Sequence, residues 1–200
     1  MTFLFDIGRV LLDFDFESSI ARLFPADVTD PGARMHRLIE RKDEFEAGKI
    51  ETDDYVRWAI ETLGSTATPD EFCHAWRHIF TPNEPMWDRV RQLAADGHRL
   101  ILFSNINSIH WPWITGEFPQ LSHFHEAVVS FKTGYIKPQP GIYHHAIDIH
   151  GLVPEETLYI DDLPANCATG RELGFRTWQY DIKDHAAFES WLAANLKSQI

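Results

Sequence analysis

The sequence predicts an α/β fold: a doubly wound, Rossmann-like parallel sheet with a small all-helical cap inserted after the first strand. In the second half of the chain, short apolar runs alternate with helical segments, which is typical of a parallel sheet covered by helices on both faces. Residues 17–82 instead show helical periodicity and no convincing strand. These observations predict a core domain of residues 1–15 and 83–200 and a cap domain of residues 16–82.

Five apolar runs have the length and residue types of buried strands. The helical segments between them often stop at a glycine, which is a common helix end. The expected strands are Thr2–Phe5, Arg99–Phe103, Ala127–Val129, Thr157–Ile160 and Arg176–Tyr180. The expected core helices are Pro85–Ala95, Ser108–Trp113, Gly141–His150, Ala165–Leu173 and Asp184–Leu196.

The expected cap begins after a segment that leaves the sheet. Val10–Phe16 alternates apolar and acidic residues and fits either a hairpin or a loop. Amphipathic segments follow, and Thr52-Asp53-Asp54 is typical of an N-terminal cap for a helix over Tyr55–Leu63. Pro69–Phe80 predicts the last helix before the strand–helix alternation resumes.

The composition is that of an ordinary globular chain: 44% of its 200 residues are hydrophobic and 24% are charged. Eighteen basic against 30 acidic residues give a net charge of −12, which argues against nucleic acid as the main partner. No apolar stretch approaches the ~20 residues of a membrane span. Cys73 and Cys167 lie in no metal or redox motif, so we expect a cytoplasmic protein with reduced thiols. We also expect a monomer or a weak homodimer.

Four short polar signals carry the functional information, because each follows an apolar run and their order is fixed. Alone, each is typical of a turn or a helix cap. Together they would meet where the carboxyl ends of parallel strands form one edge of the sheet, which is where ligands bind in such folds. The signals are Asp6 with Gly8, Ser104-Asn105, Lys137-Pro138 and Asp161-Asp162.

These motifs resemble those of the haloacid dehalogenase-like hydrolase superfamily, and the resemblance spans essentially the whole chain. The helical insertion after the first motif is similar to that superfamily's small helical cap. Phe5-Asp6-Ile7-Gly8-Arg9-Val10, together with Glu46-Ala47-Gly48-Lys49-Ile50 in the cap, resembles the branch that contains bacterial α-glucose-1-phosphate phosphatase.

The residue types themselves suit hydrolysis of a phosphate ester. Asp6 would attack phosphorus to give an aspartyl-phosphate, which water then hydrolyses. Mg²⁺, the expected cofactor, prefers oxygen ligands, and Asp6, the Gly8 carbonyl and Asp162 can supply them. Asp161 would act through a metal-bound water or by orienting that shell.

The other two motifs would handle the charge of the substrate, a small phosphorylated metabolite such as a sugar phosphate. Lys137 would offset the negative charge shared by Asp6 and the phosphoryl group. Ser104 would donate a hydrogen bond to the phosphoryl oxygens. Asn105 would hold the loop or reach the substrate.

Two positions depart from the pattern of the resembled phosphatases. Gly8 stands where most of them carry a second aspartate that protonates the leaving group, although the sugar-phosphatase branch also has glycine there. Asp13, Asp15, Glu46 and a metal-bound water are the candidate replacements. Arg9 stands where that branch usually has asparagine, and it would add a substrate contact from the cap side of the cleft.

The cap segment 46–50 is the expected specificity element, because a helix that ends in glycine can place a short loop over an open site. Two other functions stay open. A 2-haloacid dehalogenase would use the same aspartate without a metal, but the acidic pair Asp161-Asp162 favours the phosphatase. A non-catalytic phosphate-binding or interaction protein would follow if Gly8 and Arg9 had abolished turnover.

Overall fold

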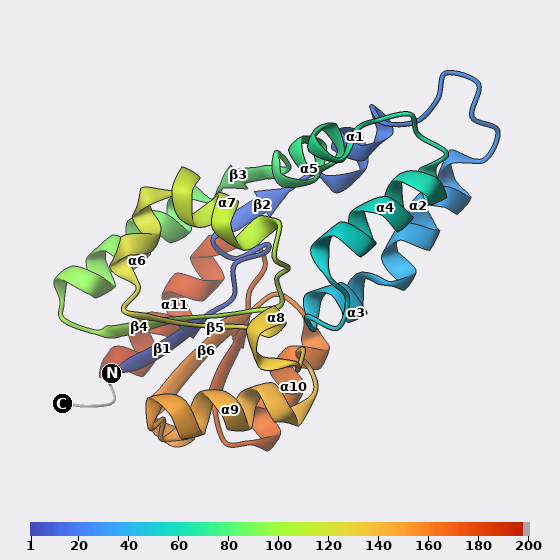
Figure 1. Cartoon of the computed structure of the whole chain (residues 1–200). Helices are drawn as coiled ribbons and strands as arrows, with labels where there is room; N and C mark the ends of the chain where they lie inside the picture. The colour runs from blue at the N-terminus through green and yellow to red at the C-terminus, as the bar shows by residue number, and fades with distance from the viewer. Residues whose placement is uncertain (198–200) are drawn as a thin grey trace.

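A five-stranded parallel sheet forms the centre of the computed structural model, which describes residues 1–197 (Figure 1). The strand order is β5-β4-β1-β6-β7, so the first strand is the middle one. Its neighbours on both sides run parallel to it. The strands are β1 (Thr2–Phe5), β4 (Arg99–Ser104), β5 (Glu126–Val129), β6 (Thr157–Asp161) and β7 (Arg176–Gln179).

Each face of the sheet packs into its own hydrophobic cluster, because alternate residues of a strand point to opposite faces. Phe3 and Phe5 join the cluster that contains residues of α6 (Glu84–Ala95) and α11 (His185–Lys197). Leu4 joins the opposite cluster, which contains residues of α9 (Pro140–His150). Helix α10 (Pro164–Glu172) contacts β6 and β7. The predicted doubly wound α/β core is therefore confirmed.

The cap consists of five helices with a hydrophobic cluster of their own, drawn on the right of Figure 1. Phe45 and Tyr55 stack at its centre with 4.1 Å between ring centroids. Ile109, which precedes a core helix, also belongs to this cluster and links the cap to the sheet domain. The helices are α1 (Phe16–Ala21), α2 (Pro31–Glu40), α3 (Lys42–Glu46), α4 (Thr52–Leu63) and α5 (Pro69–Arg77).

A two-stranded antiparallel ribbon joins the cap to the core, and it corrects the expectation of a strand-free segment 17–82. Strand β2 (Leu12–Phe14) pairs with β3 (Phe80–Pro82). The helix expected over Pro69–Phe80 ends at Arg77, because the chain then returns along the segment that left the sheet. The backbone N–H of Asp15 donates to the carbonyl of Ile79 at 2.9 Å and closes the ribbon. Three-residue strands are too short to reveal their period in the sequence.

Two helix starts also differ from the sequence prediction. Helix α7 (His110–Glu117) begins two residues later than expected, because the Asn107 side chain accepts hydrogen bonds from the N–H groups of Ile109 and His110. Thr52 is the first residue of α4 rather than its side-chain cap. Its hydroxyl instead lies 2.5 Å from that of Ser108 in the core.

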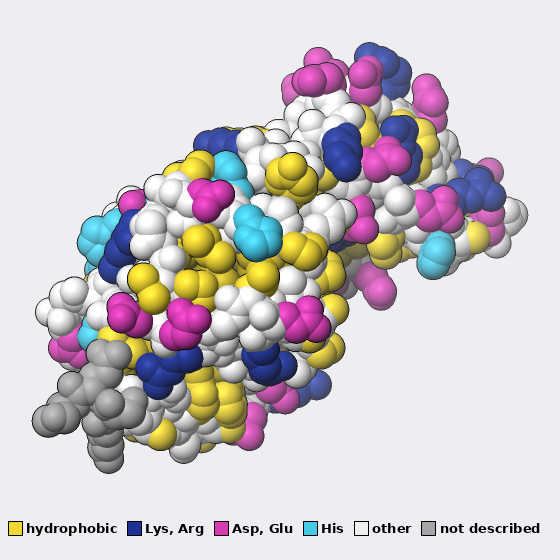
Figure 2. Space-filling model, turned by 90° about the horizontal axis from the view of Figure 1, so that it is seen from below, with side chains coloured by type: hydrophobic (Ala, Val, Ile, Leu, Met, Phe, Trp, Pro, Cys, Tyr) yellow, Lys and Arg dark blue, Asp and Glu magenta, His cyan; other side chains and the backbone are white. Residues whose placement is uncertain are grey.

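The remaining short elements are η1 (Pro119–His123), α8 (Ser130–Thr133) and η2 (Pro154–Glu156). Among residues 1–197, no helix has both the length and the apolar character that crossing a bilayer requires. On the face shown in Figure 2, acidic and basic side chains are intermixed rather than gathered into one basic area.

Candidate active site

The sheet register brings the predicted motifs to one edge. Phe5 lies opposite Leu102 of β4 and Ile160 of β6. Asp6 therefore follows at the level where β4 and β6 also end, and its N–H donates to the Ile160 carbonyl at 3.0 Å. Ser104 ends β4 and Asp161 ends β6, and both side chains are buried.

Lys137 lies at the centre of this edge and is 2% exposed. Its Nζ is 3.0 Å from Asp6 Oδ1 and 2.5 Å from Asp161 Oδ2. It also donates to the Phe103 carbonyl at 2.8 Å. Burial alone would lower the pKa of Lys137, but the charges of Asp161 and Asp6 outweigh it and raise that pKa above its usual value. The two carboxylates therefore favour the charged ammonium, which lies between Asp161 and Asp6.

Asp161 is fully buried, and each of its carboxylate oxygens takes two donors. Oδ1 accepts from Leu163 N and Asn166 Nδ2, both at 2.9 Å. Oδ2 accepts from Lys137 Nζ at 2.5 Å and Tyr159 Oη at 2.6 Å. A carboxylate has about four lone-pair positions, so this one is saturated by protein donors. This arrangement suits the orienting role expected for Asp161.

Negative charge exceeds positive charge at this edge, and the pKa values reflect it. Burial raises the pKa of Asp6 to about 6, with Asp161 adding to the rise while Lys137 and the Ser104 hydroxyl oppose it. Burial and the charges of Asp6 and Asp161 raise the pKa of Asp162 to about 7. Three carboxylates share one ammonium, so a further cation would stabilise the ionised state of the cluster.

The carboxylate cluster fits a divalent cation on geometry as well as on charge. Asp6, Asp161 and Asp162 each offer an oxygen within 4.8 Å of the others. Carboxylate oxygens are the ligands that Mg²⁺ prefers. Because the oxygens of Asp161 are occupied, Asp6 and Asp162 are the residues that we expect to hold the ion directly.

The loop after β4 is hydrogen-bonded to the loop that carries Lys137. The Asn105 side chain donates to the Lys137 carbonyl at 2.8 Å and accepts from the Lys137 N–H at 2.7 Å. Of the two expected roles for Asn105, the structure therefore places it in the one that holds the loop. Ser130, which the sequence did not single out, adds a second tie: its hydroxyl bonds both the N–H and the carbonyl of Ile106.

The residues around Gly8 are engaged with one another. The Arg9 guanidinium pairs with Asp13 and lies 4.4 Å from the centroid of the Phe14 ring. Asp15 accepts a hydrogen bond from Ser18 N and caps α1. A Cβ on Gly8 would lie 3.3 Å from the Phe14 ring, so Phe14 takes the space that a longer side chain at position 8 would use.

The cap brings one buried carboxylate toward this edge. Glu46 ends α3 and is 5% exposed, with Lys42 Nζ 2.6 Å from its Oε2. Burial raises the pKa of Glu46, while Lys42 and, more weakly, Lys137 oppose the rise. Helix α3 contacts α8 beside the sheet edge (Figure 1). A Cβ on Gly48 would lie 2.2 Å from the Phe131 carbonyl oxygen, so only glycine allows this approach.

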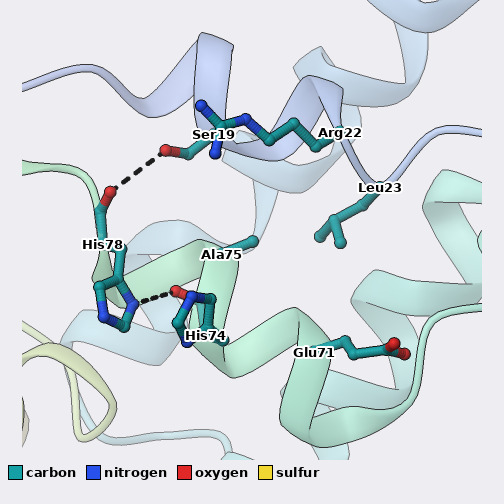
Figure 3. A pocket seen from close by; sticks show the side chains of 7 residues that line it. All are labelled: Ser19, Arg22, Leu23, Glu71, His74, Ala75 and His78. Carbon is teal, nitrogen blue, oxygen red and sulfur yellow. Dashed lines mark hydrogen bonds between the residues drawn. The ribbon is translucent and has the colours of Figure 1, made fainter.

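A separate hollow of about 240 Å³ lies within the cap between α1 and α5 (Figure 3). None of its lining residues belongs to the predicted site. The His78 ring donates from Nδ1 to the His74 carbonyl, and the Ser19 hydroxyl donates to the His78 carbonyl. The lining residues are Ser19, Arg22, Leu23, Glu71, His74, Ala75 and His78.

Comparisons with known proteins agree with this geometry. A family model described as haloacid dehalogenase-like hydrolase matches residues 1–174. The chain belongs to this family. As a haloacid dehalogenase-like (HAD) hydrolase, the protein is an enzyme, and the family resemblance expected from the four motifs is confirmed. The likeness to the glucose-1-phosphate phosphatase branch stays a prediction.

Individual relatives cover nearly the whole chain. D-ribitol-5-phosphate phosphatase of Bacteroides thetaiotaomicron is 28% identical over 184 residues, which cover 88% of this chain and 89% of that protein. A HAD-like hydrolase from Porphyromonas gingivalis has a TM-score of 0.77 at 28% identity, covering 96% of this chain and 97% of that one. A HAD family enzyme of B. thetaiotaomicron, solved with magnesium and inorganic phosphate, shares the fold with a TM-score of 0.75 at 24% identity, covering 88% and 92%.

Proposed function

We propose that this HAD hydrolase is a Mg²⁺-dependent phosphatase that acts on a small phosphorylated metabolite, with a sugar or polyol phosphate as the candidate class. The observation that carries the proposal is the cluster of Asp6, Asp161 and Asp162 around Lys137 at the carboxyl edge of the sheet. The relative named for ribitol 5-phosphate supports the substrate class. The structural relative solved with magnesium and phosphate supports the cofactor.

Asp6 is the proposed nucleophile. Lys137 and the Ile7 N–H both engage Asp6 Oδ1, which leaves Oδ2 as the oxygen that we expect to attack. The new bond joins Oδ2 to phosphorus, the bond from phosphorus to the leaving oxygen breaks, and the leaving oxygen takes a proton from water, because position 8 carries no acid. A second water then attacks the same phosphorus and the bond between Oδ2 and phosphorus breaks, which releases inorganic phosphate and a proton and returns Asp6 to its carboxylate.

The surrounding groups would stabilise the negative charge of the transferring phosphoryl group. Lys137 supplies a fixed ammonium, and Ser104 supplies a hydroxyl donor beside Asp6. Mg²⁺, held by Asp6, the Gly8 carbonyl and Asp162, would supply the positive charge that these groups lack.

The cap would contribute contacts to the leaving group. Glu46 is the proposed one, because its buried carboxylate is close enough to Lys137 for the two charges to interact. Among residues 1–197 its one hydrogen-bond partner is Lys42, which bonds Oε2. Arg9 is a second proposed contact, and reaching a substrate would require its guanidinium to leave Asp13 and the Phe14 ring.

Phosphate release from a panel of esters tests the proposal. The panel contains an aryl phosphate, ribitol 5-phosphate and a set of sugar phosphates, each assayed with Mg²⁺, with chelator and with the Asp6→Asn variant. We expect Mg²⁺-dependent release that Asp6→Asn abolishes. Absence of release from every ester by folded, Mg²⁺-binding protein would favour a non-catalytic phosphate-binding role, and halide release from a 2-haloacid in chelator would favour the dehalogenase.

A further inference from the structure

The catalytic lysine is held by a carboxylate that is itself held by a tyrosine. Lys137 Nζ and Tyr159 Oη approach the same oxygen, Asp161 Oδ2, at 2.5 Å and 2.6 Å. The carboxylate thus lies between the two groups, with the ammonium on the side of Asp6. Nothing in the sequence motifs points to Tyr159, which lies inside the apolar run of β6.

The strand period explains how Tyr159 reaches this position. Tyr159 and Asp161 are two residues apart on β6, so their side chains leave the same face of the sheet. The Tyr159 ring is completely buried and makes edge contacts with Phe103 and Tyr143, with centroids 5.4 Å and 5.9 Å away. These contacts fix the direction of the hydroxyl.

The opposing helix is shaped to admit this ring. Gly170 on α10 faces it, and a Cβ at that position would lie 2.7 Å from Tyr159 Cδ1. Such a contact is shorter than any that a methyl group tolerates, so a side chain at position 170 would push the ring and its hydroxyl away from Asp161. The glycine and the tyrosine therefore act as one unit.

The hydroxyl is the part of Tyr159 that packing does not explain. A phenylalanine would fill the same apolar space without the cost of burying a polar group. Burial and the charge of Asp161 raise the pKa of Tyr159 well above its usual value, so the hydroxyl keeps its proton and donates. Donation to an ionised acceptor gives a short, strong hydrogen bond.

We propose that Tyr159 is a positioning residue for phosphoryl transfer: its hydroxyl fixes the Asp161 carboxylate so that Lys137 Nζ stays against Asp6. The inference rests on the proposed phosphatase function. Without the hydroxyl, Asp161 Oδ2 keeps only Lys137 as a donor, and the carboxylate is anchored by protein donors at Oδ1 alone. Lys137 is then held less firmly where negative charge develops in the transition state.

Tyr180 provides a control. It follows β7 in the hydrophobic cluster on the opposite face of the sheet, is 2% exposed, and its hydroxyl bonds Asn83 and His185, both at 3.0 Å. Tyr180→Phe therefore removes a buried tyrosine hydroxyl from the core without removing a side-chain contact to Asp161, Asn166 or Tyr159.

The experiment compares Tyr159→Phe with Tyr180→Phe on an aryl phosphate at saturating Mg²⁺. Inhibition by orthovanadate and by inorganic phosphate is measured for each variant. Orthovanadate imitates the five-coordinate transferring group, and phosphate imitates the product. We expect Tyr159→Phe to lower kcat about tenfold and to weaken inhibition by orthovanadate by the same factor. KM and inhibition by phosphate should change less than about twofold. Tyr180→Phe, which removes no contact to Asp161, should change all four quantities less than about twofold.

The outcomes separate this inference from the proposed function. An active wild-type enzyme in which Tyr159→Phe has no larger effect than Tyr180→Phe would overturn the inference alone. A wild-type protein that hydrolyses no phosphate ester would overturn both. If Tyr159→Phe unfolds, Gly170→Ala carries the test, because it displaces the ring while the hydroxyl is still present, and unchanged kcat in that variant would contradict the proposal.

Discussion

Three carboxylates share one lysine at the carboxyl edge of the sheet, and this imbalance determines how each residue there behaves. The carboxylate of Asp161 is paired with the Lys137 ammonium and accepts hydrogen bonds from three further donors. Asp6 and Asp162 are left with raised pKa values, because burial and their neighbours' charges oppose ionisation. An arrangement that costs stability in this way is typical of a site built for binding or catalysis.

The Asp162→Asn variant tests the imbalance. The pKa of Asp162 rises from 3.8 to about 7 on folding. Between pH 3.8 and about 7 the native state therefore binds more protons than the unfolded state. The contribution of Asp162 to stability falls as pH rises through this window. At pH 8 we expect Asp162→Asn to stabilise the chelator-treated protein by about 1 kcal/mol, a figure reduced for the partial exposure of the side chain. Mg²⁺ should then raise the melting temperature of the variant less than that of the wild type.

Thermal unfolding at pH 8 with chelator and with Mg²⁺ measures both effects. Asp148→Asn, which removes an exposed carboxylate on α9, is the control. It should change neither the stability in chelator nor the rise in melting temperature with Mg²⁺. A less stable Asp162→Asn protein in chelator would contradict the account of crowded charge.

Glu46 leads to a prediction about substrate discrimination. If its carboxylate accepts hydrogen bonds from the leaving group, Glu46→Gln should raise KM for a polyol or sugar phosphate about tenfold, since a charge-assisted hydrogen bond is worth about 1.5–3 kcal/mol. KM for an aryl phosphate without hydroxyl groups should stay the same. Steady-state kinetics on the two esters measures the difference.

Glu44→Gln is the matched control, because Glu44 lies on the same helix and pairs with Arg41 at 3.1 Å on the exposed side. Equal effects of Glu46→Gln on both esters would show that Glu46 does not contact the leaving group.

At the scale of elements, specific contacts hold the cap against the core. Thr52 at the start of α4 lies 2.5 Å from Ser108, and His110 on α7 bonds the Trp76 carbonyl near the end of α5 at 2.8 Å. The loop after α3 touches α8 through Gly48. These contacts fix the cap over the edge of the sheet that carries the carboxylates.

The contact at Gly48 allows a direct test. Gly48 has φ of +66°, and an added Cβ would meet the Phe131 carbonyl oxygen at 2.2 Å. We expect Gly48→Ala to push the loop away from α8, raising KM several-fold and destabilising the protein by about 2 kcal/mol, of which about 1 kcal/mol comes from the positive φ. Kinetics and urea unfolding report the two effects.

Gly97→Ala isolates the cost of backbone conformation, because Gly97 has φ of +79° and an added Cβ there meets no atom within 4 Å. If Gly48→Ala and Gly97→Ala destabilise equally and leave KM unchanged, the loop does not depend on its contact with α8.

His110 makes the junction between cap and core sensitive to acid. Burial lowers its pKa to about 4, although the hydrogen bond to the Trp76 carbonyl opposes the shift. Between pH 6.5 and about 4 the unfolded state binds a proton that the folded state does not, so stability is lost as pH falls through this window. The loss should approach about 3 kcal/mol for this group.

Urea unfolding from pH 7 to pH 4.5 measures this dependence. His110→Gln should flatten it, while His36→Gln, which replaces a histidine whose side chain is 80% exposed, should leave it unchanged. A pH dependence that is identical in wild type and His110→Gln would show that His110 titrates normally.

At the scale of the whole molecule, the sequence allows the sheet and its functional edge to be predicted, because strand ends are local signals. Asp6, Lys137 and Asp161 each follow an apolar run, and parallel pairing brings such positions together without further information. The ribbon of β2 and β3 could not be predicted in the same way, since its strands are three residues long and lie 65 residues apart or more.

Side-chain contacts across the molecule were the other part that the sequence did not reveal. The sequence leaves Asn105 with two possible roles, and it does not show that the amide bonds the backbone of Lys137, 32 residues away. Tyr159 looks like an ordinary apolar strand residue, yet its hydroxyl bonds Asp161. The strand period alone places Tyr159 and Asp161 on one face, and this was the signal that could have indicated the pair.

Asp6 is the group proposed to receive the phosphoryl group, so the most direct test is to find the phosphoryl group on Asp6. Wild-type protein with Mg²⁺ and a hydrolysed phosphate ester is quenched in acid within one turnover, and the peptide that contains Asp6 is analysed by mass spectrometry. We predict a transient phosphoryl group on Asp6, absent from Asp6→Asn. Turnover without phosphorylation of Asp6, or a phosphoryl group on another residue, would contradict the account.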